Sequence, residues 1–186
     1  MKNLTEINIY DHLLTDDRLR GVLDFIRTKG FQYGWKSSEN VMFSHWNLGF
    51  SETGISRFNR ENIIDELPPA IKLVWGQIQT TVLKEYSILL RAYCNAHTYG
   101  TEGYIHRDSK YADDITAIIY LNKLWDPNWA GETILLKDNE IIKAVMPKWN
   151  RLFVFPSNLK HVARGVSRFC PEARLVLVFK ATKSLI

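Results

Sequence analysis

The spacing of apolar residues changes along the chain, from a helical period before residue 87 to a strand period after it. Leu19, Val22, Leu23 and Ile26 recur every three or four positions, which predicts a helix over residues 15–29. Thr15, Asp16 and Asp17 suit its start and Gly30 suits its end. A second stripe predicts a helix that begins at Pro68-Pro69 and runs to about Tyr86, with apolar positions Ile71, Val74, Trp75, Ile78 and Val82.

Short strands are predicted on both sides of these helices, most of them after residue 87. Residues 4–14 are interpreted as a short strand and its lead-in. Later segments are short, apolar or alternating, and separated by turn residues, which predicts strands at 88–98, 114–122, 132–136, 140–145, 151–155 and 174–181. Many short strands at this spacing are typical of a sandwich or a barrel. The two helices are expected to lie together against one face of the sheet.

Alternation in the strand at 88–98 places Leu89, Arg91, Tyr93, Asn95 and His97 on one face. If that face meets solvent, the polar row has no special meaning. If the strand lines a barrel, the same row points into a pocket. The pattern alone leaves both possibilities open.

Residues 31–60 are rich in aromatic side chains and have no clear period, so no element is assigned there. Padding of a sheet edge is one interpretation of this segment. The other is a segment that covers a substrate, since a lid combines apolar bulk with a few polar groups such as His45 and Arg57. The long loop at 123–130 is expected to hold Trp125 and Trp129 at the mouth of a cavity.

Length and composition favour one ordinary globular domain. The 186 residues are enough to bury a core, with residues 1–86 as helical support and lid and residues 87–182 as the strand-rich core. No signal peptide is indicated, and no apolar run approaches the ~18 residues of a membrane helix. Two cysteines indicate no disulfide framework, so a cytoplasmic location is expected. The formal charge of +4 is scattered along the chain, so neither a membrane nor a nucleic acid is expected as a partner.

The candidate chemistry centres on His106-x-Asp108. In an extended segment these two side chains would share one face, and His161 is the obvious third group. Two histidines and one carboxylate form the facial triad of non-haem Fe(II) oxygenases, which leaves open positions on the metal. His106, Asp108 and His161 are therefore the candidate metal ligands.

Residues from about 90 to 181 resemble the catalytic core of the Fe(II)/2-oxoglutarate dioxygenases, closest to the prolyl-hydroxylase-like branch. The resemblance depends on an ordered set of motifs, of which none is specific alone: Tyr104-Ile105-His106-Arg107-Asp108, Ile118-Ile119-Tyr120-Leu121-Asn122-Lys123, Trp125-Asp126, Ala130-Gly131-Glu132, Asn150-Arg151-Leu152-Phe153-Val154-Phe155, His161-Val162 and Arg174-Leu175-Val176-Leu177-Val178-Phe179. It implies a double-stranded β-helix (jelly-roll, cupin-like) core supported by N-terminal helices.

The resemblance also implies Fe(II), 2-oxoglutarate as co-substrate, O2, and stimulation by ascorbate. Arg174 is expected to bind the distal carboxylate of 2-oxoglutarate, since a planar guanidinium makes two parallel bonds to a carboxylate. Tyr120 matches a tyrosine that bonds the same carboxylate of 2-oxoglutarate in relatives. Tyr93 or Asn95 would bond the co-substrate or hold one of the metal ligands in place. Rival cations are Arg164, Arg168 and Lys180, for which surface positions are expected.

The expected reaction is hydroxylation of an amino acid, a small metabolite or a peptidyl residue, with conversion of 2-oxoglutarate to succinate. An apolar-walled cavity with few charges is expected, with Trp35, Trp46, Trp125 and Trp129 near its mouth and His45, Arg57 and Arg107 as polar anchors. Two alternatives remain: oxidative demethylation of nucleobases, which the Arg168/Arg174 pair weakly echoes, and a non-catalytic metabolite-binding protein of the same fold.

Overall fold

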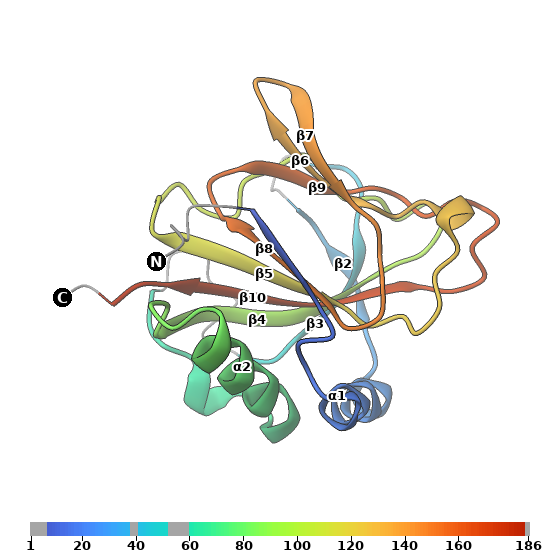
Figure 1. The fold of residues 1–186 in the computed structure, drawn as a ribbon. Coiled ribbons are helices and arrows are strands. Elements are labelled where there is room, and N and C mark those ends of the chain that lie inside the picture. Colours follow the sequence, from blue (N-terminus) through green and yellow to red (C-terminus); the bar gives the residue numbers. More distant parts are fainter. Residues whose placement is uncertain (1–6, 38–40, 52–59, 185–186) are drawn as a thin grey trace.

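The computed structural model describes residues 7–37, 41–51 and 60–184, in which two β-sheets and two α-helices form three layers (Figure 1). The helices are α1 (Asp16–Lys29) and α2 (Pro69–Thr81), and short 3-10 turns lie at Ile64–Glu66 and Pro127–Trp129. The strands are β1 (Asn8–Asp11), β2 (Gln32–Trp35), β3 (His45–Gly49), β4 (Ile88–His97), β5 (Asp114–Tyr120), β6 (Thr133–Lys137), β7 (Glu140–Val145), β8 (Arg151–Pro156), β9 (Lys160–Ala163) and β10 (Arg174–Thr182).

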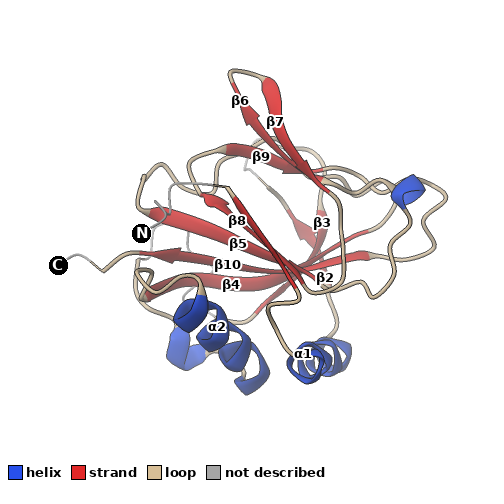
Figure 2. Cartoon of the chain, in the orientation of Figure 1, coloured by secondary structure: helices blue, strands red, loops and turns tan. Residues whose placement is uncertain are grey.

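The larger sheet has seven strands in the order β1-β8-β5-β10-β4-β3-β2, and the smaller has three in the order β7-β6-β9. All strand pairs are antiparallel. Figure 2 shows the smaller sheet on one side of the larger sheet and both helices on the other. This is the mainly β architecture of a double-stranded β-helix with flanking helices, as the sequence predicted.

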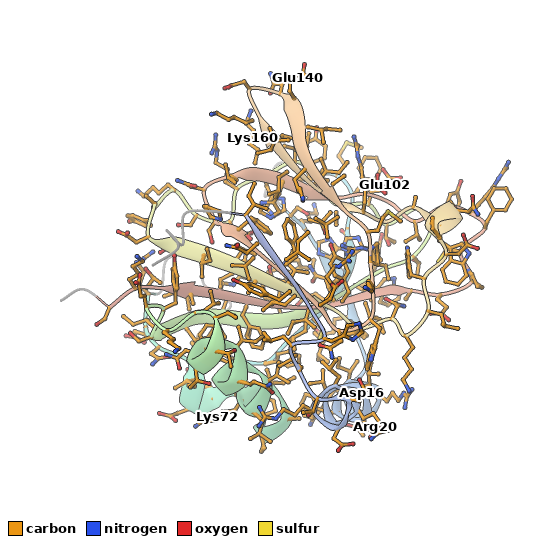
Figure 3. All side chains as sticks on the ribbon, in the orientation of Figure 1. Asp16, Arg20, Lys72, Glu102, Glu140 and Lys160 are labelled. Atoms are coloured by element: carbon orange, nitrogen blue, oxygen red, sulfur yellow. The ribbon has the colours of Figure 1, made fainter. Side chains whose placement is uncertain are left out.

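The helices cover the outer face of the larger sheet and bury the larger core there. Leu19, Val22 and Ile26 of α1 pack with Val74 and Trp75 of α2 against alternate residues of the central strands. The polar faces of both helices point away from this core, as the labelled side chains Asp16, Arg20 and Lys72 illustrate in Figure 3. The expected helix pair is confirmed, although α2 ends at Thr81 and is shorter than predicted.

The inner face of the larger sheet looks toward the smaller sheet, and its polar and apolar side chains form transverse rows. The antiparallel register sets Arg174 beside His97, Val176 beside Asn95 and Tyr120, and Lys180 beside Arg91 and Thr116. A second core of aromatic and aliphatic side chains lies between the sheets and includes Phe153 and Phe155. One end of the space between the sheets is a cavity, and polar residues form much of its lining.

Three local predictions are corrected. Residues 31–60, left unassigned, contain β2 and β3, and His161 lies in a strand, β9, that the apolar pattern did not reveal. Leu89 packs with the helix-side core, not with the inward row of Arg91, because a register shift at Lys180/Ala181 reverses the alternation of β4. Arg57 lies outside the described residues. No helix among the described residues is long and apolar enough to cross a membrane.

Candidate metal and 2-oxoglutarate site

A two-residue backbone bridge brings His106 and His161 together across 55 positions of sequence. The His106 N–H donates to the His161 carbonyl at 3.0 Å, and the His161 N–H returns the bond at 2.9 Å. The backbone N–H of Asp108 then donates to the Ser157 carbonyl at 2.9 Å. The segment 105–108 is not a regular strand, so main-chain bonds to the β8–β9 region, not strand alternation, bring the three side chains together.

The donor atoms of His106, Asp108 and His161 all lie within 4.8 Å of one another. Each histidine donates its Nδ1–H to a carbonyl two residues before it, Tyr104 at 2.6 Å and Leu159 at 3.0 Å. These bonds leave both Nε2 atoms as acceptors, and each lies 3.4 Å from one oxygen of Asp108. Two oriented imidazoles and a carboxylate with convergent lone pairs fit a divalent metal such as Fe(II).

The Asp108 carboxylate is almost completely buried and is held by two further side chains. Thr116 donates to one oxygen at 2.8 Å and the Lys180 ammonium donates to the other at 2.5 Å. Burial alone would raise the pKa of Asp108, but the Lys180 ammonium beside it holds the pKa well below its usual range. The ligand is therefore ionised at neutral pH, the state that a metal requires.

The His106 imidazole is in the state that ligation needs. Burial lowers the pKa of His106, and neighbouring His161 lowers it further, against the opposing effect of Asp108. A neutral His106 has a free Nε2 lone pair at pH 7.

Arg174 lies inside the cavity at the start of β10, with only 1% of its surface exposed. Its Nε donates to the Gly131 carbonyl at 2.5 Å and its Nη2 donates to Thr133 at 2.7 Å. The guanidinium lies over the Tyr120 ring at 5.2 Å. No carboxylate in the described part of the chain forms an ion pair with Arg174.

Tyr120 lies behind Arg174 and does not line the cavity itself. Its hydroxyl donates to Thr133 Oγ1 at 2.7 Å, the same oxygen that accepts from Arg174. Burial raises the pKa of Tyr120, so the phenol stays protonated as a donor. Tyr120 therefore supports the position of Arg174 from outside the cavity.

Four more of the predicted site residues line the same cavity: Tyr93, Asn95, His45 and Arg107. Asn95 accepts a bond from Asn47 at 2.7 Å. His45 stacks on His97 with ring centroids 4.7 Å apart, and neither ring nitrogen of His45 has a hydrogen-bond partner in the described structure. Burial and the nearby His106 lower the pKa of His45 to about 4, although the Asn95 amide opposes this shift, so His45 is neutral at pH 7.

Two expected substrate residues do not reach the cavity. Trp46 is partly exposed and packs on Tyr33 with ring centroids 5.1 Å apart. Trp125 packs on Trp129 and donates to the Ala130 carbonyl at 2.9 Å. Of the four tryptophans expected near the mouth, only Trp35 lines the cavity.

The charge of the cavity also differs from the expectation of apolar walls with few charges. Its lining contains one carboxylate, that of Asp108, and five cationic side chains: Lys36, Arg91, Arg107, Arg174 and Lys180. Arg164 and Arg168 are exposed, as predicted. Lys180, expected at the surface, instead points into the cavity; its spacing of six residues from Arg174, an even number along one strand, was the signal available for it.

The comparisons with known proteins agree with this geometry. Residues 94–179 match the family model described as the 2OG-Fe(II) oxygenase superfamily. No curated protein sequence matches the chain.

Solved structures of similar fold include a Pseudomonas putida prolyl-4-hydroxylase, with 18% identity, a TM-score of 0.64, and coverage of 96% of this chain and 92% of that one. A prolyl hydroxylase from Trichoplax adhaerens, in complex with a hypoxia inducible factor peptide fragment, has 16% identity, a TM-score of 0.69, and coverage of 96% and 84%. HygX from Streptomyces hygroscopicus, with nickel and 2-oxoglutarate bound, has 9% identity, a TM-score of 0.64, and coverage of 98% and 85%.

Proposed function

We propose that the protein is an Fe(II)- and 2-oxoglutarate-dependent hydroxylase, because residues 94–179 match the family model of the 2OG-Fe(II) oxygenase superfamily. Its substrate would be an amino acid, a small metabolite or a peptidyl residue. His106, Asp108 and His161 would hold the metal, and Arg174 would hold the co-substrate. Ascorbate would act as a stimulant and not as a substrate.

The observation that carries this proposal is a buried cation, Arg174, that has no carboxylate partner among the described residues and shares a cavity with a metal-ligand cluster. A guanidinium that is 1% exposed and unpaired in this way is costly unless an anion reaches it. Gly131, Thr133 and Tyr120 orient Arg174 but supply no negative charge. A dicarboxylic acid whose far carboxylate meets Arg174 and whose 2-oxo acid end meets the His/Asp/His cluster satisfies both groups.

Each of these residues has a definable part in the reaction. Bound Fe(II) would supply the O2 activation that couples conversion of 2-oxoglutarate to succinate and CO2 with insertion of one oxygen atom into the substrate. Asp108 contributes a fixed negative charge, since Lys180 and Thr116 restrict its carboxylate to one orientation. Val176 and Val178 place apolar surface between Arg174 and Lys180 along β10, which excludes water from the middle of the cavity.

The proposal is tested by incubating the protein with Fe(II), ascorbate, O2 and 2-oxoglutarate in the absence of another substrate. Slow formation of succinate is expected, because an oxygenase of this kind turns over partly uncoupled. A metabolite-binding protein of the same fold would bind 2-oxoglutarate without forming succinate, so binding without any conversion contradicts the proposal. Exposed Arg168 is not part of the cavity, so the Arg168/Arg174 pair does not support a nucleobase demethylase.

Gly131→Ala is expected to weaken 2-oxoglutarate binding roughly tenfold, about 1.4 kcal/mol. Gly131 has φ +80°, and an added Cβ would lie 3.0 Å from the Trp125 ring and 3.2 Å from Cδ of Arg174. The clash and the strained backbone would displace both Arg174 and the carbonyl that orients it. Calorimetric titration with 2-oxoglutarate measures the effect.

Gly30→Ala is the matched control for this variant. Gly30 also has a positive φ, +73°, but an added Cβ meets nothing within 4 Å. Its backbone strain should lower stability without changing 2-oxoglutarate affinity. Equal affinities in Gly131→Ala and the wild type would show that Arg174 does not depend on this glycine.

A further inference from the structure

Arg91 lies on the inner face of β4, directly across from Lys180 of β10. Its guanidinium is 5.4 Å from the centre of the Trp35 ring and 5.2 Å from that of Tyr93. The Lys180 ammonium lies 5.4 Å from the same Tyr93 ring and bonds to Asp108. A continuous series of contacts thus connects Arg91 with the metal-ligand cluster, and Arg91 lines the cavity that contains it.

No acidic side chain in the described part of the chain pairs with Arg91. Its Nε is buried and forms no hydrogen bond, and Arg91 takes part in no ion pair among the described residues. The nearby carboxylate of Asp108 is already paired with Lys180. Two cations directly opposite each other on neighbouring strands destabilise a sheet, so the unmatched Arg91 is an energetic cost that folding alone does not explain.

The charges of the metal and of 2-oxoglutarate do not neutralise the positive charge of Arg91. Arg174 is matched by the far carboxylate of 2-oxoglutarate, Lys180 by Asp108, and a divalent metal adds positive charge where the 2-oxo acid end binds. Arg91 therefore stays unmatched when metal and co-substrate are present. Arg107, which lines the same cavity, adds a second cation at its exposed edge.

The geometry of Arg91 is that of a preformed oxyanion receptor. Two aromatic rings hold the guanidinium, which lowers the entropy lost when it binds. Its Nε is buried, so the Nη end of the guanidinium is the part that can offer its N–H groups to a carboxylate or phosphate in the cavity. A neutral ligand would leave the charge unpaired.

We propose that the substrate carries a free oxyanion, a carboxylate or a phosphate, that Arg91 binds beside the metal-ligand cluster. The inference deepens the proposed function, on which it rests, because it concerns the substrate of the same cavity. It narrows the substrate from any amino acid, metabolite or peptidyl residue to a molecule that carries a free carboxylate or phosphate. An internal residue of a peptide without an acidic side chain lacks the group that Arg91 requires.

The test compares acids with their neutral counterparts by ligand-observed NMR on protein loaded with Zn(II), a redox-inert metal that allows no turnover. The carboxylate arm contains free L-amino acids against their C-terminal amides, and the phosphate arm contains glycerol 3-phosphate against glycerol. Saturating 2-oxoglutarate keeps Arg174 occupied. Wild type is compared with Arg91→Met, which keeps the apolar stem, and with the control Arg168→Met, which also removes an arginine beside an aromatic ring, Phe169, but outside the cavity.

At least one acid is expected to bind ten times or more tightly than its neutral counterpart in wild type and in Arg168→Met. In Arg91→Met, the ratio of the affinity for the acid to the affinity for its neutral counterpart should fall to about one. Acids and neutral counterparts that bind alike, or a preference that survives Arg91→Met, would overturn the inference. Failure of 2-oxoglutarate itself to bind would count against the proposed function instead, since the preference for acids is measured separately from it.

Discussion

Asp108→Ala is expected to abolish succinate formation and to lower the affinity for Fe(II), or for Mn(II) as a stable substitute, by at least about 100-fold. The variant removes the charged ligand of the cluster, whereas loss of a residue that merely orients a ligand costs roughly 10–100-fold. Metal affinity is measured directly by calorimetry with Mn(II), so the result does not depend on activity. Normal metal binding and turnover in Asp108→Ala would refute the assignment of the cluster.

Asp108→Ala is also expected to lower the free energy of unfolding, because Asp108 is the buried partner of Lys180. Removing one member of a buried ion pair costs about 3–5 kcal/mol, a large part of the total stability of a small domain. The contact of Asp108 with Lys180 at 2.5 Å therefore makes the fold sensitive to this loss. Asp108→Ala combined with Lys180→Met removes both charges and should restore the free energy of unfolding without restoring metal affinity.

Asp114→Ala is the matched control for Asp108→Ala. Asp114 is also buried and is paired with Arg60 at 2.8 Å and Ser109 at 2.5 Å, although the Arg60 side chain is 40% exposed and that of Lys180 only 12%; Asp114 is not part of the metal-ligand cluster. Its loss should lower the free energy of unfolding by a similar amount and leave metal affinity unchanged. If both aspartate variants lose metal in proportion to stability, the effect of Asp108 is structural and the ligand assignment is wrong.

Arg174→Met is expected to raise the concentration of 2-oxoglutarate required for half-maximal binding by at least an order of magnitude. Truncating a buried, bidentate charge partner typically costs about 2–5 kcal/mol, and each 1.4 kcal/mol corresponds to a factor of ten. The thermal stabilisation of the wild type by 2-oxoglutarate should disappear in the variant, because a ligand stabilises only the state that binds it. Thermal denaturation with increasing 2-oxoglutarate measures both quantities.

Arg168→Met should behave as wild type in the same titration, since Arg168 is exposed and lies outside the cavity. If Arg168→Met loses 2-oxoglutarate binding and Arg174→Met keeps it, the co-substrate position is misassigned. The nucleobase-demethylase alternative would then regain support.

Much of the fold and of the candidate site was predictable because both depend on short-range patterns. The period of 3.6 identified α1, and the period of 2 identified β4, β5 and β10 to within a few residues. The same period placed Arg174 and Lys180 on one face of β10, although we expected Lys180 at the surface. The His106, Asp108, His161 set came from residue type and order, since few other chemistries use that combination.

Only the tertiary structure decided which face of each strand is the inner one and what each polar side chain meets there. The register shift in β4 separates Leu89 from Arg91, and a backbone bridge aligns His106 with His161. Two contacts join segments that are distant in sequence: the pairing of Lys180 with Asp108 and the stacking of His45 on His97. The lack of a partner for the Arg91 Nε among the described residues also became visible only in the folded structure. Side-chain periodicity is a local property of the chain, whereas register, bulges and charge balance depend on partners that only folding brings together.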